Sequence, residues 1–218
     1  MFHSQKKLLN KSLGCNLFSY HRLFLKSQIM REKLMLICLG TIVLFSFNDV
    51  KEERFPRDLK NGHIDFSINP SGNEFIMPSN AKAELQMIDK INALRKKKGL
   101  KALKYDVNLT LAARYHAADM AIEGYFEHHT YNFRNHQLVD DLGTFQRLKR
   151  FYKGPGYANS ENCAAGNISV EESYLQWFHS PGHYANMLNP SSTHIGIGYH
   201  YSENSVYGAY WVMDTASE

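Results

Sequence analysis

Residues 195–212 read IGIGYHYSENSVYGAYWV. Apolar residues alternate with glycine or polar residues over 195–201, the polar turn Ser202–Ser205 follows, and a second run rich in aromatic and β-branched residues covers Val206–Val212. This pattern predicts a β-hairpin. Upstream of the hairpin, apolar residues recur mainly at helical spacing, so helices come first and strands lie between them or at the end. This order is typical of an α+β domain whose sheet is covered by helices.

Two longer helices are predicted upstream of the hairpin. Ser79 or Asn80 can cap the first, whose apolar residues recur at helical spacing up to the cationic run 95–98 and Gly99, an ordinary helix end. One face of the second helix is formed by Leu109, Ala112, Ala113, His116 and Met120. We expect His116 to be a hydrogen-bonded, half-buried member of that face rather than a ligand.

Two shorter helices are predicted in the second half of the chain. One covers Thr144–Tyr152, inside a polar, aromatic-rich segment. The other runs through Trp177 and begins at Ser169, where Ser at the N-cap and Glu172 three residues later form a capping box. We expect Trp177 to anchor this helix on the sheet.

The first 47 residues resemble an export leader. Residues 1–33 contain seven Lys or Arg and one acid, and residues 34–47 read LMLICLGTIVLFSF without a charge. A basic flank before an apolar run of this length is typical of a secretory signal, and the run is short for a membrane span. Translation could start at Met1 or at Met30, and an uncleaved anchor is the alternative to a cleaved signal. The prediction is a leader over 1–47, a linker or stalk over 48–78 with a short strand at His63–Ile68, and a folded domain over 79–218.

Charge and cysteine content exclude two classes of protein. Residues 1–33 carry a net charge of +6 and the rest of the chain −2, for a total of +4, so the folded domain lacks the basic face that a nucleic-acid-binding domain needs. Cys15 and Cys38 also lie in the leader, which leaves Cys163 alone in the exported part and excludes an internal disulfide. Cys163 could be a nucleophile near His183, but we expect a small buried side chain.

Three segments set polar residues beside turn-forming residues or at a helix end: 125–129 (YFEHH), 160–166 (SENCAAG) and 177–184 (WFHSPGHY). Two imidazoles and one carboxylate from separate loops can form an open zinc site, because zinc accepts such ligands and leaves a position for water. The same groups can act as acid and base on a bound ligand. The spacing alone does not distinguish these roles.

The same segments carry a resemblance to a known family. Phe126-Glu127-His128, Glu161-Asn162-Cys163-Ala164 and the run 177–190, WFHSPGHYANMLNP, resemble the CAP superfamily (cysteine-rich secretory proteins, antigen 5 and pathogenesis-related proteins), in particular its bacterial branch of SCP-like extracellular proteins. The resemblance spans about residues 79–216. It implies an α-β-α sandwich with a wide cleft lined by two histidines and one or two glutamates.

Residue by residue, the resemblance implies that His128, Glu161 and His183 line the cleft and form its metal-ligand set, with Ser180 and Asn162 beside them. His129 is the alternative to His128. Ser160 stands where the family usually has Gly, and Ser180 stands where many eukaryotic members have a second cleft Glu. The missing carboxylate weakens a full metal site.

The expected function is that of an exported, non-enzymatic binding module. Its cleft would take a small ligand, a lipid or a divalent metal such as zinc, its partner would lie in the cell envelope, and only the N-terminal segment would meet a membrane. The alternative is a metal-dependent hydrolase or peptidase in which Glu161 and His183 are catalytic. A third possibility is a structural envelope protein that displays the domain on a stalk.

Overall fold

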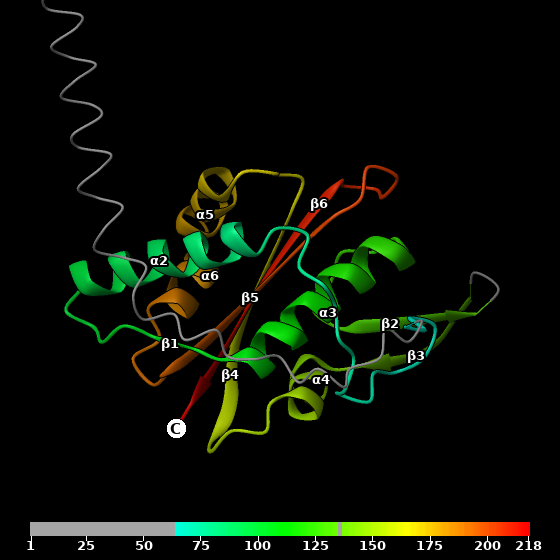
Figure 1. Ribbon diagram of the computed structural model, residues 1–218, viewed down its shortest axis with the longest axis horizontal. Helices are drawn as coiled ribbons and strands as arrows, with labels where there is room; N and C mark the ends of the chain where they lie inside the picture. The colour runs from blue at the N-terminus through cyan, green and yellow to red at the C-terminus, as the bar shows by residue number, and fades with distance from the viewer. Residues whose placement is uncertain (1–63, 135–136) are drawn as a thin grey trace, which may run out of the picture. The chain divides into compact units, whose positions relative to one another are not determined.

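The computed structural model describes residues 64–134 and 137–218 (Figure 1). The predicted leader, both candidate start residues and linker residues 48–63 lie outside the described residues. Among the helices that are described, none combines the length and the apolar character needed to cross a bilayer. In chain order the elements are α2 (Ala81–Lys97), β1 (Lys104–Tyr105), α3 (Val107–Glu123), β2 (Thr130–Arg134), β3 (Gln137–Leu142), α4 (Thr144–Phe151), β4 (Tyr157–Ala165), α5 (Val170–His179), α6 (Pro181–Met187), β5 (His194–Tyr201) and β6 (Ala209–Ser217).

The main sheet has four strands in the order β1-β5-β6-β4. The predicted hairpin is confirmed, because β5 and β6 pair antiparallel with Ile197 opposite Met213. Strand β4 pairs antiparallel with β6 and forms one edge of the sheet, and β1 pairs parallel with β5 at the other edge. A separate antiparallel hairpin joins β2 and β3, which the sequence did not predict.

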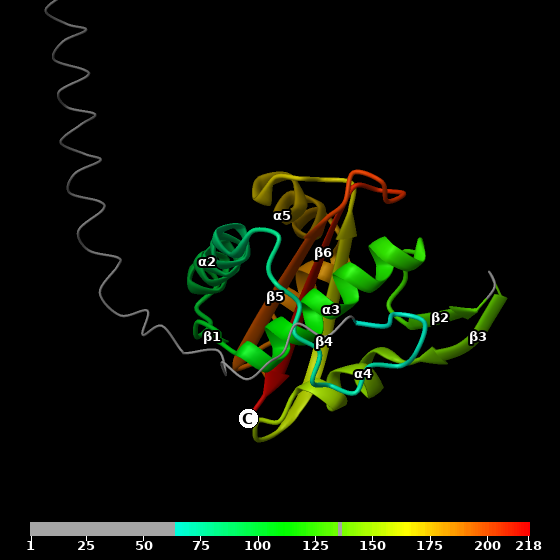
Figure 2. The ribbon, with the colours of Figure 1, turned by 45° about the vertical axis from the view of Figure 1, so that its right-hand side comes forward.

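Helices cover both faces of the main sheet, so the predicted α+β sandwich is confirmed (Figures 1 and 2). Along β6 the side chains alternate: Trp211 and Met213 pack with α2, α5 and α6, whereas Tyr210 and Val212 pack against α3. This alternation is the ordinary consequence of the strand period of two. Trp177 lies in the first of these cores and is fully buried, as predicted.

The glycines of β5 allow α3 to lie directly on the sheet. A Cβ atom added to Gly196 would lie 2.2 Å from the backbone of Leu109, and one added to Gly198 would lie 2.2 Å from the backbone of Ala113. Only glycine leaves room for the helix backbone at these two positions. The Ile-Gly-Ile-Gly pattern therefore sets the spacing between α3 and β5.

The predicted helix starts are formed by side-chain caps. Asn80, one of the two candidates, caps α2 and accepts a hydrogen bond from the Ala83 N–H at 3.1 Å. Ser169 caps α5 and accepts from the Glu172 N–H at 3.2 Å. The prediction for His116 was wrong in one respect: the residue is fully buried rather than half-buried, because α3 is covered by the sheet on one side and by α4 and residues 64–76 on the other.

The described part of the range predicted as a linker packs on the domain. Ile64, Phe66 and Ile76 contact the core around Tyr115, and the Phe66 and Tyr115 rings lie 5.3 Å apart. Residues 64–68 form no strand, contrary to the prediction. Instead, Asp65 accepts hydrogen bonds from the backbone and hydroxyl of Ser67, a local arrangement that competes with strand pairing.

Candidate functional site

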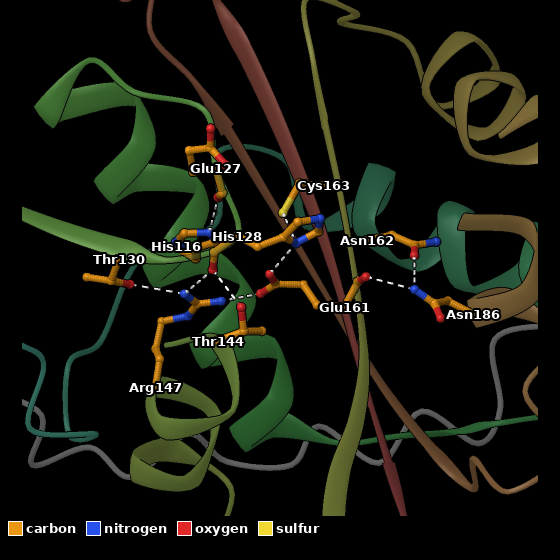
Figure 3. Close-up of polar contacts among 10 residues, drawn as sticks. All are labelled: His116, Glu127, His128, Thr130, Thr144, Arg147, Glu161, Asn162, Cys163 and Asn186. Carbon is orange, nitrogen blue, oxygen red and sulfur yellow. Dashed lines mark hydrogen bonds and ion pairs between the residues drawn. The ribbon is translucent and has the colours of Figure 1, made fainter. Parts of the chain in front are cut away.

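The candidate site is built around the edge strand β4. Glu161 and Asn162 are consecutive residues of this strand. The sequence analysis had placed them in a loop, and that expectation was wrong. Because side chains alternate along a strand, Glu161 points to the side of α3 and α4, whereas Asn162 points to the side of α6. The polar groups of the site therefore lie on both sides of one strand (Figure 3).

On the first side, Glu161 binds one histidine and one arginine (Figure 3). Nδ1 of His128 lies 2.8 Å from Oε1 of Glu161, and the Arg147 guanidinium donates to Oε2. Both oxygens of the buried carboxylate are thus occupied. The His128 side chain is half exposed, at 51%, whereas that of Glu161 is 2% exposed. His128 therefore lies at the mouth of the site and Glu161 at its floor.

Helix α4 fixes the backbone of His128. The Thr144 hydroxyl donates to the His128 carbonyl at 2.8 Å, and Arg147 donates to the same carbonyl at 3.0 Å. A further Arg147 hydrogen bond reaches the Thr130 hydroxyl at 3.0 Å. Arg147 thus links α4, β2, β4 and the segment that carries His128, and sequence reasoning missed it.

On the other side of β4, an amide network holds α6. The Asn162 side chain donates to the His183 carbonyl at 2.9 Å, and Asn186 donates to the Asn162 side chain at 2.9 Å and to the Glu161 carbonyl at 3.0 Å. The network places His183 beside the strand residue next to Glu161. Nδ1 of His183 is buried and has no hydrogen-bond partner.

The remaining predicted site residues have other roles. Ser180 is the N-cap of α6, and its carbonyl accepts from the Tyr184 N–H at 2.8 Å, while its hydroxyl makes no capping bond. His129, the alternative to His128, lies 3.1 Å from an Asp141 carboxylate oxygen (Nδ1 to Oδ2) and not on Glu161. Asn162 stabilises local structure, because its contacts are with Asn186 and the His183 backbone.

Charge neighbours set the protonation of the site. Burial alone would raise the pKa of Glu161, but Arg147 and His128 outweigh this and lower it below its usual range. The hydrogen bond to Glu161 raises the pKa of His128, whereas burial and the nearby His128 lower that of His183. At neutral pH the floor of the site is therefore a carboxylate, and His183 is a neutral imidazole.

Two further acids are buried near Glu161, and the sequence analysis missed both. Asp214 stands opposite Glu161 in the β4–β6 ladder, is fully buried, and neither of its carboxyl oxygens has a hydrogen-bond partner. Burial and the Glu161 charge raise its pKa well above the usual range. Asp119 of α3 accepts a hydrogen bond from the Tyr125 hydroxyl, and burial raises its pKa to about 7.

Cys163 is buried on the same side of β4 as Glu161. Its Sγ lies 3.7 Å from Nδ1 of His128 (Figure 3), and burial together with the Glu161 charge raises the pKa of the thiol well above its ordinary value. Such a thiol is protonated at neutral pH and is a poor nucleophile. Ligand atoms of His116, Glu161 and Cys163 lie within 4.8 Å of one another, so this buried group could hold a metal ion.

Two curated proteins are similar to this chain in sequence. The chain is 37% identical over 126 residues to the uncharacterized protein YkwD of Bacillus subtilis, a match that covers 56% of this chain and 44% of that protein. It is 28% identical over 129 residues to the uncharacterized membrane protein YlbC of the same organism, covering 57% and 34%. The matches thus span less than half the length of these curated relatives.

Solved structures show the same fold. An extracellular protein containing a SCP domain from Bacillus anthracis has 26% identity and a TM-score of 0.51, over 62% of this chain and 40% of that one. An outer surface protein of Borrelia burgdorferi has 19% identity and a TM-score of 0.53, over 66% and 99%. The model of the cysteine-rich secretory protein family matches residues 88–215, more than half of the chain. The site residues and the family motifs lie within this matched range, as does most of the main sheet. The chain therefore belongs to the cysteine-rich secretory protein (CAP) family.

Proposed function

We propose that this CAP-domain protein is an exported binding module and not an enzyme. One observation carries the proposal: the groups that a hydrolase would need are held in unreactive states. Both oxygens of Glu161 are bound by Arg147 and His128, so this carboxylate is poorly placed to accept a proton from water. Burial and the Glu161 charge raise the pKa of the Cys163 thiol, so this group is protonated at neutral pH.

The outer part of the site has groups that can bind a ligand. His128 is half exposed, and His183 offers a buried nitrogen that has no partner. The donor types of His128, Glu161 and His183 suit zinc, and the free nitrogen of His183 fits a ligand role. However, Arg147 already neutralises Glu161, and Ser180 supplies no second carboxylate. We therefore expect zinc binding by these three residues to be modest and reversible.

The test compares binding with turnover. Purified full-length protein is titrated with zinc by calorimetry, and is separately incubated with casein, esters and cell-wall fragments with and without chelator. We expect zinc uptake that weakens in His183→Ala and no turnover. Chelator-sensitive hydrolysis that disappears in Glu161→Gln would replace the binding role with that of a metal-dependent hydrolase.

Export is the second part of the proposal. The leader predicted from residues 1–47 supports it, as does the description of the Bacillus anthracis relative as extracellular. We expect the mature chain outside the cytoplasm, beginning after about Phe47 if the signal is cleaved. Fractionation and mass spectrometry of the native protein test this. An intact Met1 in the soluble cytoplasmic fraction would contradict it.

A groove between α2 and α5 favours a lipid among the expected ligand classes. Its volume is about 590 Å³, and its apolar lining includes Leu94, Tyr174 and Phe178. Lys97 and Lys98 also line it, so an amphiphile with an anionic head and an apolar tail is the occupant that suits its chemistry. Fluorescent fatty-acid binding that falls in Phe178→Asp would support this class, and no binding to the wild-type protein would exclude it.

A further inference from the structure

Most of the buried polar atoms beneath His128 that have no hydrogen-bond partner are acceptors, although one donor, Nε of Arg147, is also unpaired. The buried atoms without a partner include Nδ1 of His116, Oδ1 of Asp119 and both carboxyl oxygens of Asp214. Buried acceptors are normally satisfied, and each one left unpaired costs roughly 1–3 kcal/mol. A cation bound in this part of the molecule would satisfy the unpaired lone pairs.

The ligand types in this interior are those that zinc prefers. An imidazole, a thiol and a carboxylate come from His116, Cys163 and Glu161, and their ligand atoms lie within 4.8 Å of one another. Nδ1 of His128 adds a fourth candidate, 2.8 Å from Oε1 of Glu161 and 3.7 Å from Sγ of Cys163. Two ligands on one tetrahedral zinc stand about 3.3–3.6 Å apart, given bond lengths of roughly 2.0–2.3 Å. The two separations from Nδ1 of His128 therefore lie on either side of the range for a coordinated ion.

The hydrogen bonding of His116 leaves one nitrogen available. Nε2 lies 2.9 Å from the Glu127 carbonyl oxygen, which can only accept, so Nε2 carries the proton. Nδ1 then has a free lone pair and no partner. Metal-binding histidines usually donate their other N–H to a carbonyl or carboxylate in this way, which fixes the ring and the tautomer.

The charges around the group also favour a cation. Three carboxyl groups, Asp119, Glu161 and Asp214, are buried in this region together with the guanidinium of Arg147. Burial raises the pKa values of Asp119 and Asp214, and a cation bound beside them would favour their ionised forms. A metal ion could enter from the side of His128, because this side chain contacts Cys163 and is itself half exposed to solvent.

We propose that His116, Cys163 and Glu161, closed by His128, form an inner binding site for a thiophilic divalent metal such as zinc. The inference rests on the proposed binding role of the cleft, but it uses Cys163 and His116 in place of His183. Binding converts the Cys163 thiol to a thiolate and displaces the proton between His128 and Glu161, and both protons pass to solvent. Arg147 stays on the second oxygen of Glu161 and orients the carboxylate.

Cobalt titration of the full chain tests the site. Cys15 and Cys38 are replaced by serine, so that Cys163 is the only thiol. We expect one equivalent of Co²⁺ to give a thiolate-to-cobalt charge-transfer absorption and the intense visible bands typical of four ligands, separately from any metal held by His183, and we expect zinc to displace it. Cys163→Ala should remove the charge-transfer band and weaken binding at least tenfold, and His116→Gln should weaken it by about 10–100-fold.

His183→Ala is the matched control, because it removes the histidine of the outer cleft and should leave the charge-transfer band unchanged. Cobalt that binds without this band, or that binds to Cys163→Ala as tightly as to the parent, overturns the inner site. If that cobalt is lost in His183→Ala, the outer site stands and only the inner one fails. No metal uptake at all also overturns the inference, whereas ligand binding by the groove is unaffected.

A second measurement covers the case in which Cys163→Ala does not fold. In the single-cysteine parent, zinc bound to Cys163 should slow alkylation of the thiol at least tenfold, with calcium as the control ion. Equal alkylation rates with zinc and with calcium would contradict the proposal without any core substitution.

Discussion

The guanidinium of Arg147 donates to Oε2 of Glu161, and the two side chains are only 0% and 2% exposed. This ion pair links helix α4 to the edge strand β4 at the floor of the candidate site. Its energy depends on both partners being present, because a buried charge left alone must be desolvated without compensation. The arginine is therefore as much a part of the site as the glutamate that the family motif contains.

Removing the arginine should destabilise the fold. Arg147→Met keeps the length of the side chain but leaves Glu161 charged and buried, so we expect a loss of about 3–5 kcal/mol of unfolding free energy. Urea unfolding at neutral pH measures this. Lys149→Met on the exposed side of the same helix is the control and should change stability by less than about 0.5 kcal/mol. Equal midpoints for the two variants would contradict the role of the ion pair.

The glycines of β5 give a second prediction. In Gly198→Ala the new methyl group would collide with the backbone of Ala113 and Arg114, and backbone cannot move aside as a side chain can. We expect a loss of about 1–3 kcal/mol or more. Gly182→Ala is the control, because nothing lies within 4 Å of its added Cβ and the residue is helical. It should be neutral or stabilising by up to about 1 kcal/mol. Denaturant midpoints that fall equally in both variants would show that close packing of α3 is not the cause.

These glycines illustrate which parts of the fold the sequence could predict. The alternation in 195–201 and the caps at Asn80 and Ser169 are local signals, and the structure confirms each of them. Strands β2 and β3 were missed because the alternation in TYNFR covers only five residues and QLVDDL has no clean apolar alternation, so their pairing depends on contacts with the rest of the domain. The strand character of β4 was missed because its polar residues resemble those of a loop.

The site could be predicted only as far as its motifs reach. His128 and Glu161 come together from segments 33 residues apart, and the family motifs alone indicated this. Arg147 was overlooked because an arginine on a short amphipathic helix is normally exposed. One signal was available. Arg147 lies one residue before Leu148 and four before Phe151, a spacing that places it on the buried face of α4. Nothing in the local sequence predicted that Asp214 is buried beside Glu161. Its position there depends on how β6 pairs with β4.

Trp177 gives a third prediction. The indole is fully buried between α2 and the sheet, so Trp177→Ala should cost about 3–5 kcal/mol. Its Nε1 has no hydrogen-bond partner, so Trp177→Phe should retain most of the stability. Leu175→Ala, at a site 38% exposed on the same helix, serves as the control. Thermal unfolding of the three variants tests the order, and a Trp177→Ala midpoint equal to that of Leu175→Ala would exclude a core role for the indole.

The last prediction concerns stability against pH in metal-free protein. Burial raises the pKa of Asp119 from 3.8 to about 7, so between these values the folded state holds a proton that the unfolded state has lost. Stability from this group therefore falls as pH rises through that range. Burial, aided by Arg147, lowers the pKa of His116 from 6.5 to about 3, so here the unfolded state holds the extra proton and stability rises with pH. The two effects oppose each other between about pH 4 and pH 6.5.

Asp119→Asn should remove one of these opposing effects and leave the other. The asparagine oxygen can still accept from Tyr125, so the variant should fold, but its unfolding free energy should rise with pH more steeply than that of the wild type. The expected difference in slope is up to about 1.4 kcal/mol per pH unit between about pH 4 and pH 6.5, the value for one proton. Urea unfolding in chelator across this range measures it. Asp89→Asn, on the exposed face of α2, is the control and should run parallel to the wild type. If Asp119→Asn also runs parallel, Asp119 does not hold a proton in the folded protein in this range, and burial does not raise its pKa as described.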